Sequence, residues 1–384
     1  MKKILIVNNN LIIGGIQKAL VSFIEAICDD YEVSLLLFRK EGALIDQIPT
    51  NVKIIETTSA YKYLGKRQAM WSLCGKIKRG ILVVLTRIFG FKATVPIMNA
   101  TIKKGELTQE YDLAISYMQN SERRVFYGGV ANYVLSKKVR AKRKACFIHC
   151  DYLQSGTAYP YNNELYRKFN KIVCVSDSVK HRFDKVLPDM SAKTIGMYNA
   201  VNANKIREFS MMKSYKYDKN YINYISVARL SPEKGLERAI RAFSKIETNT
   251  LRYYIVGDGN LRSELEKLIN ELKLNERVFL LGETDNPYRY MIGADWLLVP
   301  SYHEAAPVVF QEAVVLGLPI LTTNTASAQE MIGERYGLVV DNSDDGLIKG
   351  IKKTVDSLQE YRALSKTFEY DTASFKEQFL KLFE

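Results

Sequence analysis

Short, continuous apolar runs alternate with helical segments along this chain, and the alternation starts twice. A run of four to seven apolar residues between polar loops is typical of a strand that is buried on both faces. In the first half we expect strands at 4–7, 33–38, 113–116, 145–148 and 172–175, with a helix at 16–27. In the second half we expect strands at 222–228, 252–256, 278–281, 296–299 and 320–322, with helices at 236–246 and 261–272. Strands that alternate with helices predict α/β units with parallel sheets.

The restart of the pattern predicts two domains, which suits a chain of 384 residues. We expect two Rossmann-like, doubly wound domains that face each other across a cleft. Residues 1–200 form the first and residues 201–365 the second, and residues 366–384 form a C-terminal helix that packs back towards the first domain. The linker is expected near 199–221, because residues 203–220 are polar and charged without apolar periodicity.

The net charge of +13 belongs to the first half of the chain. Residues 1–200 hold 31 Lys and Arg against 16 Asp and Glu, whereas residues 201–384 hold 24 against 26. Residues 57–105 contain ten basic residues, no acidic residue and several large apolar ones, and a second basic cluster runs from Lys137 to Lys144. One interpretation is an interfacial segment that contacts an anionic membrane. The other is that the apolar residues pack into the domain and the charges are solvated.

The cysteines and the apolar runs indicate the compartment. The five cysteines form no C-x-x-C pair, which argues against a disulfide framework and a structural zinc site. No apolar stretch approaches the roughly 20 residues that a membrane span needs, and residues 4–7 are too few for a signal peptide. We therefore expect a cytoplasmic protein.

Loops that follow expected strands have the composition of an anion site. Arg229 and Lys234 flank a helix start, where cations are unfavourable unless an anion binds. Gly14 and Gly15 let the backbone approach a ligand at another helix start. Gly257-Asp258-Gly259 is a tight turn after a strand. The alternatives are a solvated loop in which Lys234 pairs with Glu233, and ordinary glycine turns.

The loop after the strand at 296–299 carries two glutamates eight residues apart. Pro307 suits the first turn of a helix and Gly317 suits its end, so Glu304 precedes the helix and Glu312 lies within it. At that separation the two carboxylates suit different ends of one ligand better than one reacting atom. The alternative is a solvated helix start with Glu312 paired on the surface.

The second half resembles the retaining nucleotide-sugar glycosyltransferases of family 4, of the bacterial cell-surface polysaccharide type, which have the GT-B fold. The matching segments are VARLSPEKGLERAIRAF (227–243), YYIVGDGNLRSELEKL (253–268), RVFLLGE (277–283) and ADWLLVPSYHEAAPVVFQEAVVLGLPILTTNTASAQEMI (294–332), the last with the E-x7-E motif. In the first half, the Gly14–Gly15 loop, FIHCD (147–151) and VSDS (175–178) match more loosely.

This resemblance implies roles for individual residues. Arg229 and Lys234 would hold the donor diphosphate, Glu304 would contact sugar hydroxyls, and Glu312 would contact the ribose. Gly14 and Gly15 would close over the phosphates, and His149 would lie near the reacting sugar, although a satisfied, partly buried histidine is the alternative for His149. The remaining donor-binding residues would be Gly259, Asn260, Leu261, Gly282, Glu283, Ala305, Ala306, Pro307 and Val308. Two departures are Ala305-Ala306 after the first glutamate and Asn199-Ala200-Val201-Asn202 at the hinge.

The resemblance implies a retaining, metal-independent hexosyltransferase without a cofactor. It would move a sugar from a UDP- or GDP-sugar to a hydroxyl of a glycan or lipid-linked acceptor in cell-surface polysaccharide synthesis, as a peripheral protein on the inner face of the cell membrane. No Asp-x-Asp pair occurs in the sequence, which agrees with Arg229 and Lys234 supplying the positive charge. The alternatives are a basic nucleic-acid-binding protein, although no nucleic-acid partner is expected, and a non-catalytic sugar-nucleotide-binding protein.

Overall fold

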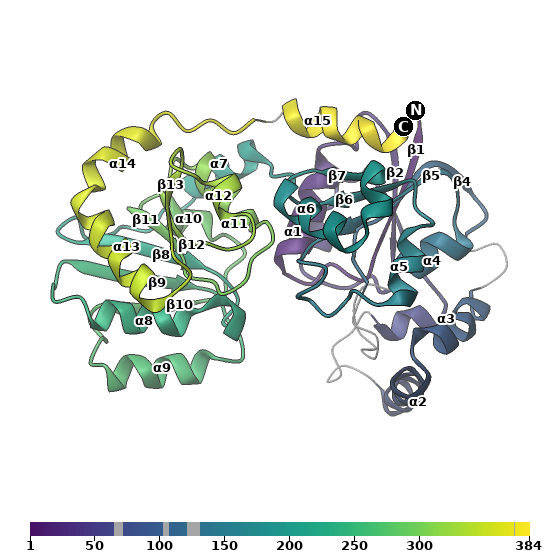
Figure 1. Cartoon of the computed structure of the whole chain (residues 1–384), viewed down its shortest axis with the longest axis horizontal. Helices are drawn as coiled ribbons and strands as arrows, with labels where there is room; N and C mark the ends of the chain where they lie inside the picture. The colour runs from purple at the N-terminus through teal and green to yellow at the C-terminus, as the bar shows by residue number, and fades with distance from the viewer. Residues whose placement is uncertain (65–71, 103–106, 121–130, 372) are drawn as a thin grey trace. The chain divides into compact units, whose positions relative to one another are not determined.

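The computed structural model describes residues 1–64, 72–102, 107–120, 131–371 and 373–384, which form two compact units (Figure 1). Unit 1 consists of Met1–Ala200 and the C-terminal helices, and unit 2 consists of Val201–Asp371. Each unit is built on one parallel sheet, so the prediction of two doubly wound α/β domains is confirmed. In the described ranges no helix is both long enough and apolar enough to cross a bilayer.

The sheet of unit 1 has seven parallel strands in the order β3-β2-β1-β4-β5-β6-β7. The strands are β1 (Lys3–Asn8), β2 (Glu32–Leu37), β3 (Lys53–Glu56), β4 (Glu110–Ser116), β5 (Arg140–Ile148), β6 (Lys171–Cys174) and β7 (Thr194–Gly196). The helices are α1 (Gly15–Glu25), α2 (Leu73–Phe89), α3 (Phe91–Ala100), α4 (Ala131–Lys138), α5 (Pro160–Tyr166) and α6 (Asp177–Val186). The central strand β1 is buried at Ile4 through Asn8, which explains its uninterrupted apolar run.

The end of the chain completes the core of unit 1. Helix α15 (Ala373–Leu380) places Phe375 and Phe379 edge-on against Phe23 of α1, with ring centroids 5.5 and 5.6 Å apart. Edge-to-face pairs of buried aromatic rings stabilise such contacts beyond the area they bury. The chain therefore leaves unit 1 after Ala200, forms all of unit 2, and returns.

The sheet of unit 2 has six parallel strands in the order β10-β9-β8-β11-β12-β13. The strands are β8 (Ile222–Val227), β9 (Leu251–Val256), β10 (Val278–Gly282), β11 (Trp296–Val299), β12 (Ile320–Thr323) and β13 (Gly337–Val340). The helices are α7 (Ala203–Met211), α8 (Leu236–Ser244), α9 (Arg262–Glu271), α10 (Tyr288–Met291), α11 (Val308–Val315), α12 (Ala328–Met331), α13 (Asp344–Asp356) and α14 (Leu358–Ser365). The strand order reverses between β8 and β11, and open α/β sheets bind ligands beyond the carboxyl ends of the strands at such a reversal.

The chain passes from unit 1 to unit 2 at Ala200–Val201, within the range expected for the linker, but the rest of that range belongs to unit 2. Its residues 203–211 form α7, in which Ile206 is buried and packs against Val315 of α11. Further along, the buried Tyr217 donates a hydrogen bond to Tyr290 O at 2.8 Å. A short helix that buries one narrow face carries too few apolar positions to show a period in the sequence.

Candidate functional site

The loops that follow β8 and β11 are held against each other by Gly235. This residue joins a 3-10 turn (Pro232–Lys234) to α8 in a left-handed conformation, with φ of +61°. A Cβ atom there would lie 2.2 Å from Pro300 O, which no side chain tolerates. Because the residue at 235 has no side chain, Lys234 reaches the loop that carries Glu304.

Lys234 and Glu304 form the ion pair at the centre of this site. Lys234 Nζ lies 2.6 Å from Glu304 Oε1, and Ser301 Oγ donates to the same oxygen at 2.8 Å. The side chains are 25% and 12% exposed, respectively, so the pair is largely shielded but open to a ligand from one side. The alternative that Lys234 pairs with Glu233 is wrong, because Arg229 takes that glutamate.

Arg229 lies at the exposed rim of the same loop. Its guanidinium contacts Glu233 Oε1 at 2.7 Å, and Ser231 Oγ donates to this oxygen at 2.6 Å. Burial of Glu233 opposes its ionisation, but the hydrogen bonds from Ser231 and Arg229 outweigh that effect and lower the pKa of Glu233 to about 2. Glu233 is therefore ionised at neutral pH and holds Arg229 beside the loop.

Arg238, which the sequence did not single out, holds the loop after β11 through its guanidinium group. Arg238 lies on α8 and is only 2% exposed. It donates to Pro300 O at 2.7 Å, Ser301 O at 2.8 Å, Asn342 Oδ1 at 2.8 Å and Thr323 Oγ1 at 3.3 Å. Its Cζ also lies 4.0 Å from the ring centroid of Tyr302. A charged residue in an amphipathic helix is expected to face solvent, so no signal in the sequence distinguished Arg238 from its neighbours.

The second motif glutamate, Glu312, lies on a different element from Glu304. Glu304 precedes α11 in the loop after β11, whereas Glu312 lies on α11 and is buried. Tyr288 donates its hydroxyl to Glu312 Oε1 at 2.9 Å. The motif therefore presents one carboxylate from a loop and one from a helix, as the sequence predicted. Between them, Ala305 and Pro307 are buried and Ala306 and Val308 are half-buried.

The glycines after β9 serve the packing of two loops. A Cβ at Gly259 would lie 2.3 Å from Leu230 O, and one at Gly257, whose φ is +142°, would lie 1.9 Å from Ala228 O. Two backbone hydrogen bonds join the same loops, from Leu230 N to Asp258 O and from Leu261 N to Leu230 O. The close approach of the two loops is therefore sufficient to explain the glycines at 257 and 259. A contact of residues 259–261 with a base stays a prediction.

Asn260 and Glu283 are exposed, and Leu261 and Gly282 are half-buried. Gly282 O accepts a hydrogen bond from Gly257 N at 2.8 Å, so the ends of β9 and β10 meet here. These residues therefore border the carboxyl edge of the sheet on the β9 side.

In unit 1, Gly14 and Gly15 form the start of α1. Gly14 is the extended residue before the helix, and the space next to the α-carbon of Gly15 is open. The loop begins at Asn8 and Asn9, whose side-chain oxygens are buried and accept no hydrogen bond within the described ranges. The glycine loop therefore follows β1, next to the reversal of strand order between β1 and β4.

His149 follows β5 at the same edge of that sheet and is half-buried. Its Nε2 lies 2.7 Å from Tyr117 O, and a carbonyl oxygen only accepts, so Nε2 carries the proton and Nδ1 has the free lone pair. The ring stacks on Phe147 with a centroid distance of 5.7 Å. Burial lowers the pKa of His149 to about 4, so the ring is neutral at pH 7.

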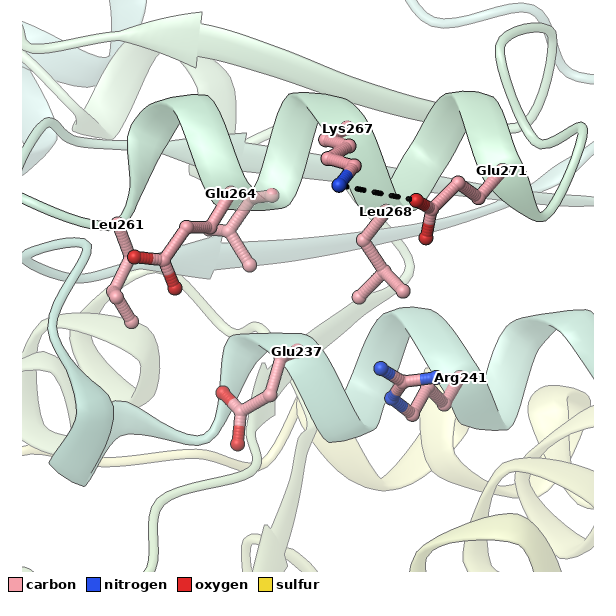
Figure 2. Close-up of a pocket in the computed structure, with 8 residues that line it drawn as sticks. Glu237, Arg241, Leu261, Glu264, Lys267, Leu268 and Glu271 are labelled. Atoms are coloured by element: carbon pink, nitrogen blue, oxygen red, sulfur yellow. Dashed lines mark ion pairs between the residues drawn. The ribbon is translucent and has the colours of Figure 1, made fainter.

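A groove lies between α8 and α9 (Figure 2), and neither Lys234 nor Glu304 is among the residues that line it. Its floor includes Leu261 and Leu268, and its rim carries three glutamates and two cations: Glu237, Glu264, Glu271, Arg241 and Lys267. Lys267 pairs with Glu271 at 3.6 Å. An excess of carboxylates repels a diphosphate, so this groove does not suit the anionic part of a nucleotide sugar.

Residues 208–368, which cover most of unit 2 and less than half of the chain, match the family model described as "Glycosyl transferases group 1". Among solved structures, Anabaena HepE in complex with UDP-glucose is similar over 100% of this chain and 99% of its own, with a TM-score of 0.69 and 17% identity. At this identity the likeness shows the fold alone, and the expected GT-B fold is confirmed.

Two curated relatives are similar to part of the chain. An N-acetylgalactosamine-N,N'-diacetylbacillosaminyl-diphospho-undecaprenol 4-alpha-N-acetylgalactosaminyltransferase of Campylobacter jejuni is 32% identical over 177 residues, which cover 44% of this chain and 47% of the relative. The O-antigen biosynthesis glycosyltransferase WclY of Escherichia coli is 28% identical over 169 residues, which cover 43% and 46%. The matched stretch thus spans about half the length of these relatives.

Replacing Arg238 with Met should loosen the loop that carries Glu304. The substitution leaves buried carbonyl oxygens of Pro300 and Ser301 without donors, which costs about 3 kcal/mol of unfolding free energy. We expect urea unfolding at a lower midpoint and faster hydrogen exchange of the amides in residues 300–307. Arg241→Met, one turn further along α8 and exposed, is the matched control and should leave both unchanged. Equal unfolding midpoints and exchange rates in the two variants would contradict the role of Arg238 in holding this loop.

The neutral His149 should make the stability of unit 1 depend on pH. Its pKa is about 4 in the folded chain against 6.5 for an ordinary histidine, so between these values the unfolded chain binds a proton that the folded chain does not. This contribution is complete above pH 6.5 and is lost as the pH falls to 4. His149→Gln keeps a donor for Tyr117 O but cannot be protonated, so its unfolding free energy should fall less over this window. Exposed His181→Gln is the control, and a slope for His149→Gln equal to that of the wild type would refute the assignment.

Proposed function

We propose that the protein is a retaining glycosyltransferase that moves a sugar from a nucleotide-diphosphate sugar to a hydroxyl group. The observation that carries this proposal is the Lys234–Glu304 pair at the carboxyl ends of β8 and β11. There a cation for the diphosphate lies beside a carboxylate for sugar hydroxyls, within the segment that matches the glycosyl transferases of group 1.

The cations of the β8 loop stabilise the leaving diphosphate. An ammonium group has three N–H donors, and Glu304 accepts one of those of Lys234. Arg229, exposed at the rim, adds a second cation that shifts from Glu233 to the more highly charged ligand. Negative charge on the diphosphate grows as the bond to the sugar breaks, so these fixed cations stabilise the transition state more than the bound donor. The reaction proceeds without a metal ion.

The two carboxylates bind opposite ends of the donor. Glu304 accepts hydrogen bonds from sugar hydroxyls with the oxygen that Lys234 and Ser301 leave available. Glu312 accepts from the ribose, and Tyr288 orients its carboxylate. Ala305, Ala306, Pro307 and Val308 link the two glutamates, and the backbone of residues 259–261 and 282–283 contacts the base.

The acceptor hydroxyl attacks the anomeric carbon from the face that the diphosphate leaves, so the configuration is retained. The bond from the anomeric carbon to the phosphate oxygen breaks as the bond to the acceptor oxygen forms. The acceptor's proton passes to the departing phosphate oxygen, so no strong protein base is required. For Gly14, Gly15 and His149 of unit 1, the contacts with phosphates and sugar that the family resemblance implies stay predictions.

The names of the relatives support an acceptor in cell-surface polysaccharide synthesis. One relative is named for a diphospho-undecaprenol acceptor and the other for O-antigen biosynthesis. We infer a glycan or lipid-linked acceptor for this chain, used at the inner face of the cell membrane.

A donor screen tests the proposed activity. The protein is incubated with UDP-, GDP- and ADP-sugars, and released nucleoside diphosphate is measured with and without EDTA. We expect release from one nucleotide class and no loss with the chelator, because protein cations carry the charge. Release that EDTA abolishes would overturn the metal-independent mechanism, and no release from any donor, with or without acceptor glycans, would overturn the function.

Replacing Lys234 with Ala should lower turnover at saturating donor by about 10²–10³-fold, the usual effect of removing one preorganised group that stabilises developing negative charge. Lys267→Ala is the matched control, because Lys267 lies in the same unit, at the groove of Figure 2. Circular dichroism checks that both variants are folded. Turnover of Lys234→Ala near the wild-type value would refute the assignment.

A further inference from the structure

Helix α2 presents an apolar stripe to solvent. Five aliphatic residues of α2 are each more than half exposed: Leu73 (77%), Ile77 (57%), Ile81 (56%), Val84 (53%) and Ile88 (62%). At about 100° per residue they fall within roughly 80° of one helix face. Aliphatic residues that pack into a core are buried, so the alternative that these residues pack into the domain is wrong for this face.

The opposite face of α2 attaches the helix to unit 1. Gly75, Leu82 and Thr86 are buried, and Thr86 Oγ1 donates to Thr94 Oγ1 of α3 at 3.2 Å. Arg79 also points inward and donates to Tyr63 O at 2.6 Å. The rotation of α2 about its axis is therefore fixed, and the apolar stripe faces away from the contacts that hold the helix. In Figure 1, α2 is seen end-on at the margin of unit 1, beyond α3.

Exposed cations border the stripe on both sides. On the same helical wheel, Lys76 and Arg87 lie on one flank and Lys78 on the other, and all three are exposed. Residues 57–105 contain no acidic residue, so nothing in this segment neutralises these cations. Of the ten basic residues there, Lys66, Arg67, Lys103 and Lys104 lie outside the described ranges, as does Trp71.

We propose that α2 lies in the plane of an anionic membrane surface, with its apolar stripe among the acyl chains and Lys76, Lys78 and Arg87 at the phosphate level. An aliphatic stripe between cationic flanks is the pattern of an interfacial helix on anionic lipid. Ile97 of the neighbouring helix α3 is also exposed. A symmetric pairing of two copies through this face is disfavoured, because each cationic flank would meet cations of the other copy.

This surface is independent of the Lys234–Glu304 site and goes beyond the proposed function. It would place the chain where a lipid-linked acceptor lies, but lipid binding itself requires neither donor nor acceptor. The two proposals can therefore fail separately.

Vesicle flotation of the full chain tests the surface. The probe is phosphatidylcholine vesicles with or without phosphatidylglycerol. We expect the protein to float only with the anionic vesicles, and to dissociate at high salt to the extent that the cations contribute. No difference between the two vesicle types would overturn the proposal.

Two variants separate the apolar and electrostatic contributions. Ile77→Gln with Ile88→Gln removes apolar surface without adding charge, and Lys76→Gln with Arg87→Gln removes cations. Each should lower the partition coefficient by about tenfold or more. Leu380→Gln, at a residue of α15 that is 55% exposed, is the matched control and should bind like the wild type.

Two further measurements decide between lipid and a second copy. Circular dichroism and nucleoside-diphosphate release without vesicles should be unchanged in the α2 variants, which shows that they are folded. Light scattering after size exclusion should give the same mass for the wild type and the variants. A wild-type dimer that Ile77→Gln with Ile88→Gln dissociates, together with unchanged flotation, would assign the face to a second copy and overturn the proposal.

Discussion

The close approach of loop backbones at the carboxyl edge of the second sheet is the constraint on which the candidate site depends. At Gly235, Gly257 and Gly259 a single methyl group would meet a carbonyl oxygen at 1.9–2.3 Å. Arg238 then donates to Pro300 O, the carbonyl oxygen that Gly235 faces, and to the neighbouring Ser301 O. The glycines thus allow the loop backbones to contact each other, and the buried guanidinium of Arg238 donates hydrogen bonds to the carbonyl groups that this contact shields from water. Lys234 and Glu304 take their positions from this frame.

The ion pairs of the candidate site also balance its charge. Two cations close to a binding surface repel each other and the helix start when no anion is present. In this structure Glu304 neutralises Lys234, and Glu233 neutralises Arg229. The two carboxylates therefore offset the repulsion between these cations and the helix start. Glu304 differs from Glu233 in its burial, because its side chain is 12% exposed and that of Glu233 is 38% exposed.

Much of the fold was predictable from the sequence, because strands buried on both faces leave uninterrupted apolar runs such as 4–7 and 296–299. The site was predictable where composition and position coincide, as for Glu304 in a loop and Glu312 in a helix. Three features were not predictable. Arg238 has the local sequence pattern of a surface residue. Helix α7 buries too narrow a stripe to show an apolar period. Gly259 is needed because its backbone contacts Leu230, which lies 29 residues away in the chain. For α2 the sequence shows which residues are apolar but not which face the rest of the chain covers.

The return of the chain to unit 1 has a consequence for biosynthesis. Phe375 and Phe379 cover Phe23, but the ribosome makes them only after it has made the whole of unit 2. Until then the nascent first unit exposes an aromatic ring that its final fold encloses, a situation in which chaperones bind and misassembly begins. Unit 2, in contrast, is one continuous segment and has every residue of its core as soon as Asp371 leaves the exit tunnel. Although unit 2 is synthesised after most of unit 1, its full set of core residues leaves the ribosome before that of unit 1.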